Sequence, residues 1–285
     1  MKIIVTADST ADVPKQFQKE FEIVPCPLIV NLGDEDFYDD GVSITSEKIF
    51  DYVDKTGSLP KTAARSAESY KEYFEQVKKE HKADKIIHIS LSSGLSSTCQ
   101  NSKLAAEELG YVGVVDSLSL STGSGLIALS AGDKIKEGKA FEQILEELKE
   151  EVPRVQASFI ISNLNYLHKG GRCSAVAVFG ANVLRIKPKI KLSDGKMIVD
   201  RKYIGKYEVV IEKYVNDLLS EYKNPVLDRA FVTYTTENKA LNEMIIKKLE
   251  AAGFKQIICN LAGATITSHC GKDTLGVLFI NGEKA

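Results

Sequence analysis

The chain has 285 residues, of which 44% are hydrophobic and 27% are charged, the composition of an ordinary globular protein long enough for two domains or one large one. The formal net charge of -2 gives no reason to expect nucleic acid or an anionic membrane surface as a partner. The sequence has five cysteines but no C-x-x-C pair, so we expect no disulfide framework and no structural metal. It shows no signal-peptide pattern and no long apolar run, so we expect a cytoplasmic protein with no membrane span.

In the first half of the chain, short apolar runs alternate with amphipathic stretches. Strands are predicted at residues 2–7, 86–91 and 112–115, and a helix pattern follows each of them. This alternation predicts a parallel sheet covered on both faces. The run 22–31 is interrupted by prolines, as is typical of an edge strand. Right-handed crossovers would bring the polar turns at the strand ends to one edge of the sheet.

The stretch that most directly indicates function is Ile86–Gln100, IIHISLSSGLSSTCQ. An apolar strand stops at a turn rich in Ser and Gly, and a helix pattern follows. The free backbone N–H groups of such a turn, together with the positive end of the helix dipole, can receive a phosphate, a carboxylate or a developing alkoxide. A plainer interpretation is that Ser92 or Ser93 simply caps the helix.

The pattern changes near Pro153. Beyond it, the hairpin signal Ser193-Asp194-Gly195 is mixed with helix patterns, and residues 267–282 are predicted to form a polar turn followed by a final strand. We therefore expect an α/β protein of two domains. These are an N-terminal Rossmann-like domain with a parallel sheet (residues 1–153) and a C-terminal α+β domain with a mixed sheet (residues 154–285).

Several common catalytic motifs are absent or misplaced. Gly123 and Gly125 match part of the dinucleotide-binding fingerprint, but they fall inside a helix pattern, so close helix packing explains them better. No Walker A sequence and no G-x-S-x-G elbow occur, which disfavours a nucleotide-dependent kinase. The four histidines lack metal-ligand spacing. We expect His88 to be packed in the core, whereas His269 lies in a polar stretch that is better suited to chemistry.

Two neighbouring segments carry a cation and an apolar surface. Lys169-Gly170-Gly171-Arg172 is most simply a glycine helix terminus with basic residues that interact favourably with the helix dipole. Arg172 is nonetheless a good bidentate partner for a carboxylate or a phosphate. The apolar stretch 175–184 either lines a tunnel or belongs to the ordinary core.

Seven short motifs occur in a fixed order along the chain. They are Asp8-Ser9-Thr10-Ala11-Asp12, Tyr38-x-Asp40-Gly41, Pro60-Lys61-Thr62, Ser90-x-Ser92-Ser93-Gly94-Leu95-Ser96-x-Thr98, Val115-Asp116-Ser117, Tyr166-x-x-Lys169-Gly170-Gly171-Arg172 and His269-x-Gly271. This ordered set, which spans residue 3 to about residue 280, resembles the DegV family, the bacterial fatty-acid-binding proteins. Two positions depart from the family pattern. Ala63 replaces the usual Ser after Thr62, and Lys272-Asp273 replaces the usual Pro-Gly after Gly271.

The resemblance implies a long-chain fatty acid held between two α/β domains. Its carboxylate would be presented to a separate kinase subunit, which makes an acyl phosphate for phospholipid synthesis. Thr62 and Ser93 would donate hydroxyl hydrogen bonds to the carboxylate, with the Gly94 N–H beside them and Arg172 and His269 close by. A carboxylate removed from water needs such donors to stay ionised. We expect no cofactor and no catalysis without the kinase.

The same residues leave a second function open, a serine hydrolase that uses Ser93 with His269 and Asp116. This function requires a contact between the serine and the histidine and a base held in the correct orientation. For the carrier, the basic residues Arg201 and Lys202 lie in or near flexible turns and are predicted to dock the kinase subunit. Alternatively, Arg201 and Lys202 belong to an ordinary solvent-exposed face with no partner.

Overall fold

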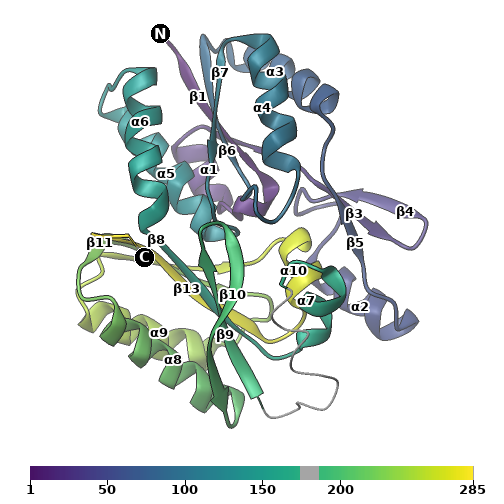
Figure 1. Cartoon of the computed structure of the whole chain (residues 1–285), viewed down its shortest axis with the longest axis vertical. Coiled ribbons are helices and arrows are strands. Elements are labelled where there is room, and N and C mark those ends of the chain that lie inside the picture. Colours follow the sequence, from purple (N-terminus) through teal and green to yellow (C-terminus); the bar gives the residue numbers. More distant parts are fainter. Residues whose placement is uncertain (174–185, 285) are drawn as a thin grey trace.

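Two large sheets lie one above the other, with a small third sheet at their side (Figure 1). The computed structural model describes residues 1–173 and 186–284. Within these ranges no helix combines the length and the apolar character needed to cross a membrane. The stretch 175–184, a predicted tunnel lining, lies outside the described residues.

The N-terminal sheet is parallel throughout, as predicted. Its strands are, in spatial order, β2 (Ile23–Cys26), β1 (Ile3–Asp8), β6 (Lys85–Ser90) and β7 (Val112–Asp116). Its helices are α1 (Lys15–Glu20), α3 (Ala67–His81), α4 (Thr98–Leu109), α5 (Thr122–Lys136) and α6 (Phe141–Glu151). Neighbouring residues of a strand face opposite sides. Ile86 accordingly packs with Tyr70 of α3, while Ile87 packs with Ile127 of α5.

The C-terminal sheet is mixed, which confirms that prediction too. Its strands are, in spatial order, β10 (Lys196–Ile204), β9 (Ile186–Ser193), β8 (Val155–Ile161), β13 (Thr274–Asn281), β11 (Pro225–Tyr234) and β12 (Gln256–Leu261). Only β11 and β12 pair in parallel. Helices α8 (Tyr207–Glu221) and α9 (Lys239–Ala251) cover one face and share an apolar cluster with it.

The small sheet consists of β4 (Glu35–Tyr38), β3 (Ile29–Leu32) and β5 (Lys61–Ala63), and helix α2 (Ser46–Thr56) lies in the connection between β4 and β5. The edge strand predicted at 22–31 is confirmed only for its first part, because β2 lies at the edge of the parallel sheet whereas β3 is the central strand of the small sheet. The run divides around Pro27 into β2 and β3, which belong to different sheets, because proline has no N–H to continue a ladder. The short helices α7 (Leu164–Gly170) and α10 (Ala264–Cys270) pack against each other, and α10 also contacts β3 and β5.

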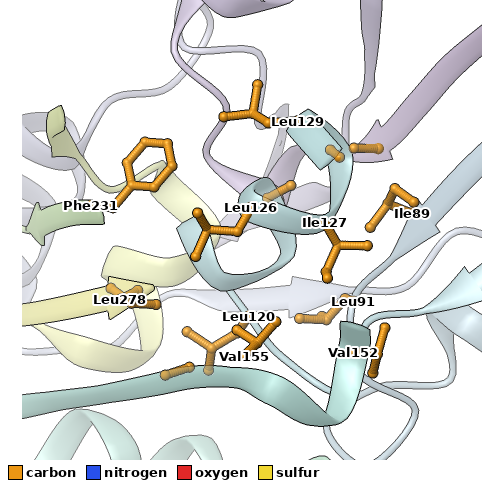
Figure 2. Close-up of a cluster of buried hydrophobic side chains, with 14 of the residues drawn as sticks. Ile89, Leu91, Leu120, Leu126, Ile127, Leu129, Val152, Val155, Phe231 and Leu278 are labelled. Carbon is orange, nitrogen blue, oxygen red and sulfur yellow. The ribbon is translucent and has the colours of Figure 1, made fainter. Parts of the chain in front are cut away.

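Helix α5 lies between the two large sheets and joins them into one core. Figure 2 shows Leu126 and Ile127 of α5 between Ile89 of the parallel sheet and Leu278 of the mixed sheet. A Cβ atom on Gly125 would lie 2.7 Å from the carbonyl oxygen of Ala11. This confirms close packing as the reason for that glycine. The predicted domain boundary falls in the short 3-10 turn Val152–Arg154, and it stays a prediction.

Candidate functional site

Thr62 and His269 meet although 207 positions separate them in the chain. Oγ1 of Thr62 lies 2.8 Å from Nε2 of His269. Thr62 is the central residue of β5, and His269 lies in the last turn of α10. The polar turn predicted around His269 is therefore wrong, because residues 264–270 form a helix with mostly buried side chains.

The carboxyl groups of two buried aspartates hold the start of α10, and burial raises the pKa of one of them, Asp12, from 3.8 to about 8. Oδ1 and Oδ2 of Asp39 accept hydrogen bonds from the N–H groups of Ala264 (3.0 Å) and Thr265 (3.1 Å). Oδ1 of Asp12 accepts a third from the N–H of Gly263 at 2.9 Å. The first N–H groups of a helix have no partner within the helix, so these two carboxyl groups stabilise a short helix that contains three β-branched residues.

The imidazole of His269 is neutral at physiological pH. Burial, and secondly the positive charge of Arg172, lower the pKa of His269 from 6.5 to about 4. Among the described residues, its buried Nδ1 has no hydrogen-bond partner. Because a buried lone pair is more often left unpaired than a buried N–H, this favours the tautomer with the proton on Nε2. His269 then donates to Thr62, and the Thr62 hydroxyl hydrogen is available for a ligand.

A cavity of about 50 Å³ lies beside this pair and combines a polar side with an apolar interior. Its polar lining residues are Thr10, Thr62, Ser96, Arg172, Thr265 and His269. Its larger apolar lining residues are Leu28, Leu91, Leu95, Leu120, Met197 and Ile266. The Oγ1 atoms of Thr10 and Thr265 are buried and have no hydrogen-bond partner within the described part of the chain. The cavity therefore suits a ligand with one polar end and an apolar body.

Arg172 places a positive charge at the exposed side of the cavity. Gly171, with a φ of 69°, forms the left-handed C-cap of α7, which confirms the interpretation of this segment as a glycine helix terminus. Arg172 follows directly, and its Nη1 donates to the carbonyl oxygen of Gly170 at 2.6 Å. This side chain is exposed, and its other guanidinium nitrogens make no hydrogen bond to a described residue.

The serine-rich turn after β6 differs from the prediction. Helix α4 begins at Thr98, so neither Ser92 nor Ser93 caps it. Ser92 Oγ instead donates to the carbonyl oxygen of Gly195 at 2.7 Å and accepts from the N–H of Gly94 at 3.2 Å. These bonds, together with the 3.1 Å bond from the Ser93 N–H to Asp116, hold the segment as an irregular turn and delay the helix.

Ser93 and Gly94 are both exposed, and neither lines the cavity, although Leu95 and Ser96 of the same turn do. Their predicted contact with a carboxylate stays a prediction. The constellation required by a serine hydrolase is not assembled either. Asp116 Oδ1 accepts from the N–H groups of Ser93 and Leu118, and Nε2 of His269 pairs with Thr62.

The predicted docking residues lie on β10, the outermost strand of the mixed sheet. Arg201 and Lys202 are exposed there, and Nη1 of Arg201 pairs with a carboxylate oxygen of Asp217 at 2.6 Å. Their role toward a partner stays a prediction.

Comparisons with known proteins agree over the whole chain. A family model described as "Uncharacterised protein, DegV family" matches residues 2–282. A fatty acid-binding protein of Thermotoga maritima is 30% identical, over 97% of this chain and 96% of that protein. The structure described as "Fatty Acid Binding of a DegV family Protein" from Thermus thermophilus has a TM-score of 0.89 at 27% identity and covers 99% of this chain and 100% of its own. A DegV lipid binding protein from Thermotoga maritima gives 0.86 at 29% identity, covering 100% of both chains.

Proposed function

This chain belongs to the DegV family, and we propose that it binds a long-chain fatty acid and presents the carboxylate to a separate kinase subunit, which forms an acyl phosphate for phospholipid synthesis. One observation carries the proposal. The Thr62–His269 pair and the Arg172 cation line the same cavity as a group of leucine, methionine and isoleucine side chains. The fatty acid and lipid binding described for its relatives supports the same ligand class.

The polar side of the cavity supplies what a fatty-acid carboxylate needs. Transfer of an ionised carboxylate out of water costs several kcal/mol unless hydrogen-bond donors replace the lost hydration. Each hydrogen bond to such a charged group contributes roughly 1.5–3 kcal/mol of stabilisation. Thr62 donates its hydroxyl hydrogen while neutral His269 donates to Thr62. Arg172 adds a positive charge from the exposed side. In the proposal, Ser93 and Gly94 complete the donor set from the neighbouring turn.

A carrier accounts for the geometry better than the hydrolase does. In a hydrolase, the histidine must accept the proton of the serine and the carboxylate must orient the histidine. Here His269 pairs with Thr62, and Asp116 pairs with backbone N–H groups. The protein then holds and orients the substrate, and the phosphoryl chemistry belongs to the kinase subunit.

Calorimetric titration with palmitate tests the proposal, using two substitutions of Thr62. Thr62→Val keeps the branched shape and removes the hydroxyl, so we expect affinity to fall about ten- to a hundredfold, the equivalent of one hydrogen bond to a charged acceptor. Thr62→Ser keeps the hydroxyl and is expected to bind nearly as well as the wild type. The proposal fails if the wild type binds no palmitate, and the role of Thr62 fails if the two variants bind equally.

A further inference from the structure

A second cavity, of about 30 Å³, lies next to the first, between α10 and the mixed sheet. Leu120, Ile266 and Cys270 line both cavities, and we call these three side chains the apolar wall. Leu120 comes from the segment just before α5, and the other two come from α10. On the far side of the wall, the second cavity is lined by Phe159 and Leu278 of the mixed sheet. Figure 2 shows Leu120 and Leu278 in the same group of buried side chains.

The two cavities differ in their free polar groups. The first is lined by the Thr62–His269 pair and by Thr10 and Thr265, whose buried hydroxyl oxygens have no hydrogen-bond partner among the described residues. The serine and threonine hydroxyls of the residues that line the second are already bonded inside the protein. These bonds are Ser121 to Asp12 (2.5 Å), Thr233 to Thr122 (2.6 Å), Thr235 to the Gly271 carbonyl (2.7 Å) and Thr274 to the Cys270 carbonyl (3.0 Å). The second cavity therefore offers mainly apolar surface.

The size of the cavities adds a constraint. Pockets that enclose drug-sized ligands usually measure about 300–1,000 Å³, which is far more than these two cavities contain together. Within the described residues, a long acyl chain gains room if the two cavities join and widen, and the side chains between them are those of the apolar wall. Ile266 is only partly buried, which leaves it room to change rotamer.

The backbone around Leu120 is unusual. Leu118 has a φ of 45° and Ser121 a φ of 50°, both in the left-handed region that residues with a Cβ rarely adopt. Such strained residues persist where the surrounding structure holds them, and they gather at ligand-contacting sites. The segment that carries Leu120 is thus held in a specific conformation between two strained residues.

We propose that the apolar wall divides the fatty-acid site into a head compartment and a tail compartment and sets the chain length above which binding requires the wall to move. The carboxylate lies on the Thr62 side, and the end of a long tail passes between Leu120 and Ile266 toward Leu278. A shorter acid stays in the first cavity and leaves the wall in place. The inference rests on the proposed function and assigns its length selectivity to named side chains.

Titration with saturated fatty acids from octanoate to stearate tests this division. Each methylene that enters apolar space strengthens binding about fourfold, so a step in this series marks the length at which the tail meets the wall. Ile266→Phe thickens the wall, and we expect it to weaken palmitate binding about tenfold or more relative to octanoate binding. Ile266→Ala thins the wall and is expected to remove the step. Ile246→Phe, the same change at a half-buried isoleucine of α9 away from both cavities, is the matched control.

The outcomes separate this inference from the proposed function. If the wild type binds no acid of the series, the proposed function is wrong. If the wild type binds palmitate but Ile266→Phe and Ile266→Ala leave the length profile unchanged, or change all lengths equally, the wall does not set selectivity. Unfolding temperatures of the three variants show that each is folded, and retained octanoate binding shows that the head compartment is intact.

Discussion

Ser93 is the residue whose role the structure leaves most open to experiment, because it is exposed and outside the cavity lining. In the proposed function its hydroxyl still donates to the bound carboxylate. We then expect Ser93→Ala to weaken palmitate binding about ten- to a hundredfold. The control is Ser97→Ala, because Ser97 is an exposed serine of the same turn whose side chain makes no capping hydrogen bond. Unchanged affinity would remove Ser93 from the site, and lost ester hydrolysis with unchanged affinity would support the hydrolase instead.

His269 gives the protein a predictable response to acid. Its pKa is lowered from 6.5 to about 4 in the folded state, first by burial and then by Arg172. Between these values His269 is protonated in the unfolded chain and neutral in the folded chain, so its contribution to the free energy of unfolding falls as the pH falls from 6.5 to 4. Asp12 acts in the opposite direction, because burial raises its pKa from 3.8 to about 8, so the effect of His269 is read from the difference between the wild type and a His269 variant. The loss attributable to His269 is roughly 3 kcal/mol at most.

Urea unfolding across this pH window measures the effect. His269→Gln should lose less stability than the wild type as the pH falls, because the glutamine has no proton to gain. His81→Gln, at the end of α3, provides the same substitution at a distance from the site. Equal pH dependence in wild type and His269→Gln would show that the histidine is not buried as described.

The sequence motifs identified some residues of the site and missed others. Thr62, Arg172 and His269 were each quoted in a motif, and they do line one cavity. Thr10 was quoted in a motif as well, whereas Thr265 was not. That their hydroxyls have no hydrogen-bond partner among the described residues could not be predicted, because nothing in a sequence shows which threonine lacks a partner in the folded state.

Helix α10 is the element that positions His269, and its stability depends on groups outside it. Asp39→Ala removes the acceptor of two backbone N–H groups, so we expect a loss of about 1–2 kcal/mol in the free energy of unfolding, as for a helix N-cap. Palmitate affinity should fall as well, because His269 lies at the other end of α10. Asp40→Ala is the matched control, since Asp40 bonds only within its own exposed turn. Equal effects of the two substitutions on palmitate affinity would contradict this role of Asp39.

Elements with strong periodicity were predicted well, and α10 was not. The hairpin lies at Asp194-Gly195, where its turn signal placed it, and helices α8 and α9 account for helix patterns expected beyond Pro153. The residues of α10, ATITSHC, are rich in β-branched and polar side chains, which have low helix propensity. The helix forms because Asp12 and Asp39, both more than two hundred positions away, bind its first N–H groups. Such distant anchors leave no local signal.

At the scale of the whole molecule, the proposed site is assembled from the small sheet, the serine-rich turn, α7 and α10. The parallel character of one large sheet and the mixed character of the other followed from the alternation of patterns along the chain. The small sheet did not, because β3 pairs with β5 across about thirty intervening residues that include α2. This pairing places Thr62 opposite Val30 and next to α10.

The docking prediction concerns the outer edge of the mixed sheet. Charge reversal of Arg201 replaces its pair with Asp217 by a repulsion, and a surface pair of this kind contributes about 1 kcal/mol or less to stability. We expect Arg201→Glu to reduce acyl phosphate formation by the cognate kinase subunit while palmitate affinity is unchanged, because the substitution lies outside the cavity. Lys255→Glu breaks a comparable exposed pair with Asp228 and should leave kinase turnover intact. Wild-type turnover of Arg201→Glu would place the docking surface elsewhere.

Native mass spectrometry of the purified protein tests the central claim most directly. The account predicts a non-covalent adduct of one fatty acid per chain, which is released on denaturation and identified by its mass. It also predicts that delipidated protein regains one palmitate when the acid is added. A protein that carries no lipid and takes up no palmitate would contradict the account, as would an acyl group that stays attached to Ser93 after denaturation.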